Sequence, residues 1–140
     1  MRKMTLAAVV AVAAGAAGFA ARASAKAESA NRYFEIRTYT AAEGKMDALH
    51  KRFRDHTLKL FSKHGIENVG YWVVNSGETA GRNLVFILAY PSKEAREKSW
   101  DAFQKDPEWV KAKADSEKEG PLVAKAVQTY MTPTDYSPIK

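Results

Sequence analysis

The period of hydrophobic and polar positions changes near residue 42 of the chain. From Tyr33 to Thr40 the two kinds of residue alternate, with aromatic and β-branched side chains enriched, which predicts a β-strand. From Gly44 to His64 apolar residues recur at steps of three and four with Lys and Arg between them, which predicts a long helix. Gly65 is the expected helix stop.

The rest of the chain completes a mixed order of strands and helices. Two predicted strands, Asn68–Asn75 and Asn83–Tyr90, are joined by a polar hairpin turn. Ser92 is the natural N-cap of a second helix. Pro107 starts a short extra helix, where its missing N–H costs nothing. Leu122–Met131 is the last strand, and the order β-α-β-β-α-(α)-β predicts an α+β fold of the ferredoxin-like type.

The strand Asn83–Tyr90 is apolar on both faces, and Asn68–Asn75 is similar. In the ferredoxin-like topology the helices cover only one face of the sheet. An antiparallel sheet with one face in water should alternate apolar and polar residues, and an exposed apolar face of this size is too large for a soluble monomer. We therefore expect a homodimer in which two copies pack sheet to sheet.

The first 25 residues do not follow these patterns. Arg2 and Lys3 precede the uncharged, Ala-rich run Thr5–Ala21, and Ala23–Ala25 has the small-x-small pattern that a signal peptidase accepts. We predict a signal peptide over residues 1–25, a linker over 26–31, one domain over 32–133 and a C-terminal tail over 134–140. A mature chain that begins at Lys26 would be detected by mass spectrometry of the native protein.

This leader implies export to the periplasm or out of the cell. A permanent membrane helix needs about 20 strongly apolar residues, and the run is mostly Ala and Gly, so no stable membrane anchor is expected after cleavage. A mitochondrial transit peptide is the alternative, because no acidic residue precedes Glu28. Transit peptides, however, spread Arg and Ser along an amphipathic helix.

Charge and cysteine content exclude several kinds of function. The net charge of +6 includes three basic residues of the leader, so the mature chain has 19 basic against 16 acidic residues. These charges alternate in sign instead of clustering as they would in a nucleic-acid binder, so no nucleic-acid partner is expected. The absence of Cys excludes disulfides, thiolate metal sites and a cysteine nucleophile.

The three histidines, His50, His56 and His64, are spaced six and eight residues apart. Metal-binding helices usually place two histidines four residues apart on one face, so we expect no metal and no cofactor. His64 precedes the helix stop and is interpreted as a C-terminal cap. His56 lies on or beside the buried stripe of the helix. It is either a packed core residue, or a ligand contact or general base in a cavity between helix and sheet.

Arg37 shares one face of the first strand with Tyr33, Glu35 and Tyr39. If this face is buried, the two charges should pair. The alternative is an anion-binding arginine in an aromatic pocket that also includes Trp72 or Tyr90. The candidate ligand-binding residues are therefore Arg37, Tyr39, His56, Trp72 and Tyr90, with His56 also a candidate catalytic base. Phosphate loops, paired carboxylates and nucleophilic triads have no signature in the chain.

Several motifs together resemble the NIPSNAP family over nearly all of Tyr33–Pro138. They are E-x-R-T-Y in the first strand, K-H-G before G-Y-W, and A-Y-P-S-x-E-A-R-E before D-P-E-W. The resemblance implies a dimeric α+β barrel, built from two ferredoxin-like subunits. It transfers no agreed catalytic residue, and mitochondrial members of the family exist.

Three classes of function are compatible with these observations. The first is a small-molecule-binding or interaction protein, and the second is a cofactor-independent oxygenase or isomerase with a pocket near His56. The third, a haem binder, ranks last because no histidine is well placed as an axial ligand. Proteins that share the barrel include cofactor-independent monooxygenases, small isomerases and haem enzymes. The fold alone therefore does not choose between the three classes.

Overall fold

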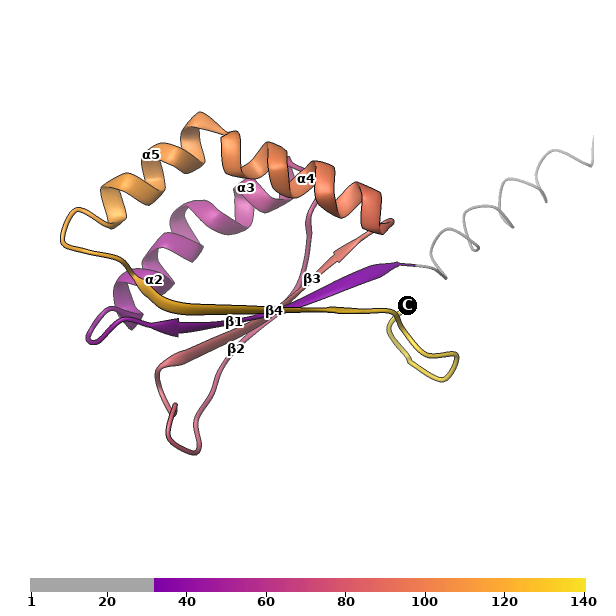
Figure 1. Ribbon diagram of the computed structural model, residues 1–140, viewed down its shortest axis with the longest axis horizontal. Coiled ribbons are helices and arrows are strands. Elements are labelled where there is room, and N and C mark those ends of the chain that lie inside the picture. The colour runs from indigo at the N-terminus through magenta and orange to yellow at the C-terminus, as the bar shows by residue number, and fades with distance from the viewer. Residues whose placement is uncertain (1–31) are drawn as a thin grey trace, which may run out of the picture.

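The structure is a computed structural model that describes residues 32–140, in which all helices lie on one face of a sheet (Figure 1). The predicted signal peptide and linker lie outside the described residues. The sheet is antiparallel in the order β2-β3-β1-β4, which confirms the ferredoxin-like α+β fold. The elements are β1 (Tyr33–Ala41), α2 (Met46–Arg52), the π-helical segment η1 (Phe53–Thr57), α3 (Leu58–Lys63), β2 (Glu67–Val73), β3 (Asn83–Tyr90), α4 (Lys93–Lys105), α5 (Pro107–Ser116) and β4 (Val123–Met131).

The predicted helix Gly44–His64 is a single helical rod, formed by α2, η1 and α3, with a π-helical turn in its middle. In this turn the Thr57 hydroxyl donates a hydrogen bond to the Arg52 carbonyl, five residues earlier, at 3.3 Å. The rod ends as predicted at Gly65, which has a φ of 73°. The Ile66 N–H donates to the Phe61 carbonyl at 3.0 Å, which completes a Schellman motif.

Side chains cap the starts of α4 and α5, and at α4 the cap is the predicted Ser92. Ser92 accepts a hydrogen bond from the Ala95 N–H at 3.1 Å, and Asp106 accepts one from the Glu108 N–H at 2.8 Å. Strands β2 and β4 differ from the predicted bounds by one or two residues. Within the described chain, no helix is both long enough and apolar enough to span a membrane.

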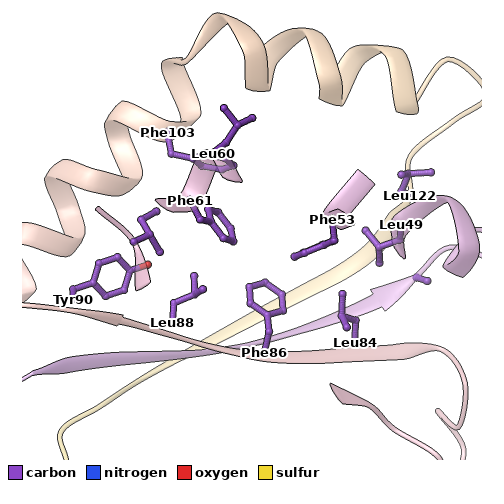
Figure 2. Close-up of a cluster of buried hydrophobic side chains, with 12 residues drawn as sticks. Leu49, Phe53, Leu60, Phe61, Leu84, Phe86, Leu88, Tyr90, Phe103 and Leu122 are labelled. Atoms are coloured by element: carbon purple, nitrogen blue, oxygen red, sulfur yellow. The ribbon is translucent and has the colours of Figure 1, made fainter. Parts of the chain in front are cut away.

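The hydrophobic core lies between the helices and the sheet (Figure 2). Phe86 is at its centre and is fully buried. Its ring lies 5.0 Å from that of Tyr39, 5.3 Å from that of Phe53 and 5.3 Å from that of Tyr71, measured between centroids. Side chains alternate between the two faces of β3. Every second one points into the core toward the helices, and these are Leu84, Phe86, Leu88 and Tyr90.

The opposite face of the sheet has no described helix over it. The register places Trp72, Val85, Thr38 and Val127 in one row across this face. Trp72 is 53% exposed and Val127 is 46% exposed. The second apolar face seen in the sequence is therefore present, and we call it the open face.

The open face also explains a glycine in β2. Gly70 sits next to a register shift in the pairing of β2 with β3. A Cβ at this position would overlap the Trp72 ring. Glycine is therefore what allows the indole to lie flat along the edge strand.

After β4 the chain continues to Lys140 without a further helix or strand. It returns toward the start of β1, where the Arg32 guanidinium donates to the Lys140 carbonyl at 2.9 Å. Phe34, Met131 and Ile139 line a shallow apolar pocket at this end of the open face.

Candidate ligand-binding site

A cavity of about 280 Å³ lies between the helices and the sheet, under α4 and α5. Its inner end is formed by the buried residues Arg37, Arg52, Phe53, Thr57, Phe61 and Phe103. Its mouth is lined by exposed residues, among them Gln104, Lys113 and Ala126. Ala126 lies on the edge strand β4 and faces the helix layer, so its small side chain leaves space unfilled beneath α5.

Glu35 lies next to this cavity, at the centre of a buried ionic network. Its carboxylate is fully buried. It accepts hydrogen bonds from Arg37 Nη1 at 2.6 Å, from Arg96 Nε at 3.0 Å and Nη2 at 2.9 Å, and from the Tyr90 hydroxyl at 3.0 Å. The expected pairing of Glu35 with Arg37 is therefore present, and Arg96 of α4 joins it.

The network sets the protonation of its members. Burial acts to raise the pKa of Glu35, but the hydrogen bond from Arg96 and the charges of Arg37 and Arg96 outweigh it, so this pKa lies below its ordinary value. Burial, followed by the negative charge of Glu35, raises the pKa of the Tyr90 hydroxyl well above its usual range. At neutral pH Glu35 is therefore an anion and Tyr90 is a neutral hydrogen-bond donor.

Arg37 connects this network to the cavity. Its guanidinium carbon lies 4.1 Å from the centroid of the Trp100 ring and 5.4 Å from that of Tyr39. Glu35 and the aromatic rings thus hold the planar group in place. Arg37 Nε is buried and has no hydrogen-bond partner among residues 32–140.

Arg52 reaches the cavity from the helical rod on the other side. Its Nη1 donates to Glu117 Oε1 at 2.8 Å, and its guanidinium carbon lies 5.3 Å from the centroid of the Trp109 ring. Arg52 is 5% exposed, and its Nε, like that of Arg37, is a buried donor that no described residue accepts from. The cavity is therefore lined by two arginines, each held by one carboxylate and one tryptophan.

The structure separates the five residues predicted as ligand contacts. Arg37 and Tyr39 line the cavity. Tyr90 lies outside the lining and hydrogen-bonds to Glu35. His56 is half-buried in η1 and is not part of the lining, and Trp72 lies on the open face, on the other side of the sheet.

Arg52 and the two tryptophans of the cavity were not among the predicted contacts. Arg52 follows Leu49 by three residues, a spacing that places both on neighbouring positions of a helix surface. The sequence therefore held a signal that this arginine flanks the buried stripe.

His64 has a structural role at the end of the rod. Its Nε2 lies 2.7 Å from Asp106 Oδ2, and Lys63 Nζ lies 2.8 Å from the same oxygen. Hydrogen bonds from Lys63 and His64 lower the pKa of Asp106. Asp106 thereby joins the C-terminal end of α3 to the N-terminal end of α5. In the described part of the chain, no three His, Asp or Glu side chains form a group able to hold a metal ion.

The fold and the cavity define a ferredoxin-like α+β protein with a ligand-sized space between helices and sheet. The chain belongs to the NIPSNAP family, whose profile matches residues 34–138. The resemblance noted from its sequence motifs is thereby confirmed. No curated protein matches the sequence.

Solved structures of similar proteins share this fold. A NIPSNAP family protein with unknown function from Agrobacterium tumefaciens is 26% identical with a TM-score of 0.67, over 79% of this chain and 96% of that chain. A NIPSNAP-like domain protein from Burkholderia xenovorans is 17% identical with a TM-score of 0.68, over 78% of this chain and 90% of that chain. A dimeric ferredoxin-like protein from an uncultured marine organism is 16% identical with a TM-score of 0.55, over 79% and 93%.

Proposed function

We propose that this protein is an exported homodimer that binds a small molecule in the cavity between its helices and its sheet. The observation that carries the proposal is the lining of that cavity, which combines aromatic rings with two buried arginines. Ligand pockets are typically apolar and hold a few convergent polar groups. An apolar cavity of about 150 Å³ is enough to bind benzene, so about 280 Å³ accommodates a small aromatic molecule.

Packing energetics support a binding role for this space. Protein interiors are close-packed and contain few voids larger than a water molecule. Buried polar groups are almost always hydrogen-bonded, yet the Nε atoms of Arg37 and Arg52 have no acceptor among residues 32–140. A ligand that fills the cavity would remove the cost of the void and would add an acceptor beside the two arginines.

The enzyme alternative has less support in the lining. A cofactor-independent oxygenase or isomerase near His56 would need that imidazole in contact with the ligand, and His56 is not part of the cavity wall. Among the described lining residues, Glu117 is the one carboxylate, and it is paired with Arg52. We therefore favour binding over catalysis at this site.

The open face supports the homodimer. Its central row contains Trp72, Val85 and Val127, and its end contains Ile87. Burial of each large aliphatic or aromatic side chain contributes about 1.5–3 kcal/mol, so a second copy stacked on this face would be strongly favoured. The structure from the uncultured marine organism is described as dimeric. Export is supported by the leader pattern of residues 1–25.

Blocking the mouth of the cavity should weaken ligand binding. Ala126→Trp places an indole in the cavity, so we expect it to weaken binding of small aromatic probes by at least about tenfold, or about 1.4 kcal/mol. Isothermal titration calorimetry with 1-naphthoate and with the neutral 1-naphthalenemethanol would measure this. The matched control is Ala80→Trp, which makes the same change in the exposed hairpin turn and should bind as the wild type does.

His56→Ala separates the two candidate functions in the same titration. Because His56 lies off the cavity wall, the affinity should stay within about twofold, or about 0.4 kcal/mol. A large loss of binding in His56→Ala would favour the alternative with a pocket at His56. Absence of binding by wild-type protein to either probe would contradict the proposed function.

A further inference from the structure

We infer that the cavity takes an aromatic carboxylate, whose anionic group binds Arg37 and Arg52 and whose planar ring lies against Trp100 and Trp109. This inference rests on the proposed function, because it names the ligand class of the same cavity. It follows from three features of the lining, which are its charge, its unpaired donors and its aromatic walls.

The charge around the cavity is positive and incompletely compensated. Glu35 offers one carboxylate to two guanidinium groups, those of Arg37 and Arg96. Arg52 is paired with Glu117, whereas Lys113 at the mouth has no carboxylate partner among the ion pairs of residues 32–140. A buried charge is costly unless it is paired. An anion is therefore the ligand charge that this environment favours.

Two arginines supply the hydrogen-bond donors that a carboxylate in the cavity would meet. Arg37 and Arg52 are both buried and both line the cavity, and each has an Nε–H group without an acceptor in the described part of the chain. Guanidinium groups bind carboxylates through two parallel N–H···O hydrogen bonds. Because Glu35 and Glu117 already hold one nitrogen of each arginine, the donors are in place before a ligand arrives.

The aromatic walls specify the rest of the ligand. Trp100 and Trp109 both pack against Phe103, with ring centroids 5.5 Å and 4.5 Å from that of its ring. Phe53 and Phe61 complete the apolar part of the inner end. A flat apolar body fits such walls through stacking and edge contacts. Inorganic phosphate or sulfate would satisfy the arginines but would leave these surfaces unfilled.

A comparison of three probes on the full-length protein tests this inference without any variant. The probes are 1-naphthoate, the neutral 1-naphthalenemethanol and inorganic phosphate, each titrated by calorimetry. We expect 1-naphthoate to bind at least about tenfold more tightly than the alcohol, which corresponds to about 1.4 kcal/mol, and phosphate to bind more weakly than 1-naphthoate. Equal affinity of acid and alcohol would overturn the anionic class but leave the proposed function intact, whereas binding of neither would defeat both. Phosphate as tight as 1-naphthoate would overturn the aromatic part.

Substitution of one arginine then assigns the preference to this site. Arg52→Gln should reduce the ratio of the affinity for 1-naphthoate to the affinity for the alcohol. The matched control is Arg54→Gln, two residues along the same helical rod but exposed, which should retain the full preference. If Arg52→Gln does not fold, as a melting curve would show, Arg52→Lys keeps the charge and loses the planar fork, and a reduced preference is expected. An undiminished preference in a folded Arg52 variant would overturn the assignment.

Discussion

Replacement of Glu35 by alanine is expected to lower the free energy of unfolding by about 3–5 kcal/mol. The carboxylate of Glu35 is fully buried and accepts hydrogen bonds from Arg37, Arg96 and Tyr90. Its loss leaves two guanidinium groups at the core without their counter-ion and leaves a void in place of the side chain. Urea unfolding at neutral pH, followed by tryptophan fluorescence, measures the difference.

A control and a pH series make this prediction specific. Glu97→Ala changes an exposed glutamate on α4 and should alter stability by less than about 0.5 kcal/mol. The pKa of Glu35 is lowered below its ordinary value of 4.5 in the folded state. Its contribution to stability is therefore complete above that value and is lost as the pH falls through the folded pKa. The difference in the free energy of unfolding between wild type and Glu35→Ala should therefore decrease in acid. A difference that increased there would contradict this assignment.

Replacement of Val85 by aspartate is expected to convert the proposed dimer into a monomer. Val85 lies in the middle of the open face, in one row with Thr38 and Trp72. In a sheet-to-sheet dimer the new carboxylate would be buried without a partner, at a cost of at least about 3 kcal/mol, or more than a hundredfold in the dissociation constant. Sedimentation velocity at micromolar concentration should give twice the chain mass for the wild type and the chain mass for the variant.

The matched control for this experiment is Val110→Asp, the same change on α5. Val110 is 54% exposed and lies in the helix layer, away from the open face. This variant should remain dimeric. A wild-type protein that is monomeric at micromolar concentration, or a Val85→Asp variant that stays dimeric, would show that the open face is not the dimer interface.

Much of the fold could be predicted because local patterns and global packing agree. The alternation of Tyr33–Thr40 corresponds to β1, and Gly65 ends the helical rod through the backbone conformation that glycine adopts most readily. The apolar second face of β3 could also be predicted, since its side chains alternate across the sheet. These features depend only on residues close together in the sequence.

The composition of the cavity could not be predicted in the same way. Residues five apart in a regular α-helix are rotated by about 140°, so the sequence places Arg52 and Thr57 on different faces. The π-helical turn between them, with its bond over five residues, brings both to the buried side and into the cavity wall. A regular helical period assigns faces wrongly around such a turn, and His56 lies within it.

The placement of Trp72 has a different cause. Strand β2 is apolar on both faces, and period-two alternation shows which residues share a face but not which face the helices cover. Tyr71 packs in the core, whereas Trp72 points the other way. The choice depends on how distant segments pack, and the same holds for Trp100 and Trp109, which come from two helices that meet above the sheet.

The positions of the three tryptophans provide the most direct measurement of where the ligand binds. Trp100 and Trp109 line the cavity, and Trp72 lies on the opposite face of the sheet. In a ¹H–¹⁵N spectrum, each indole N–H gives its own signal, which single Trp→Phe variants assign. We predict that titration with 1-naphthoate shifts the signals of Trp100 and Trp109 in a saturable manner and leaves that of Trp72 in place. Saturable binding that moves only Trp72, or none of the three, would contradict a ligand site between the helices and the sheet.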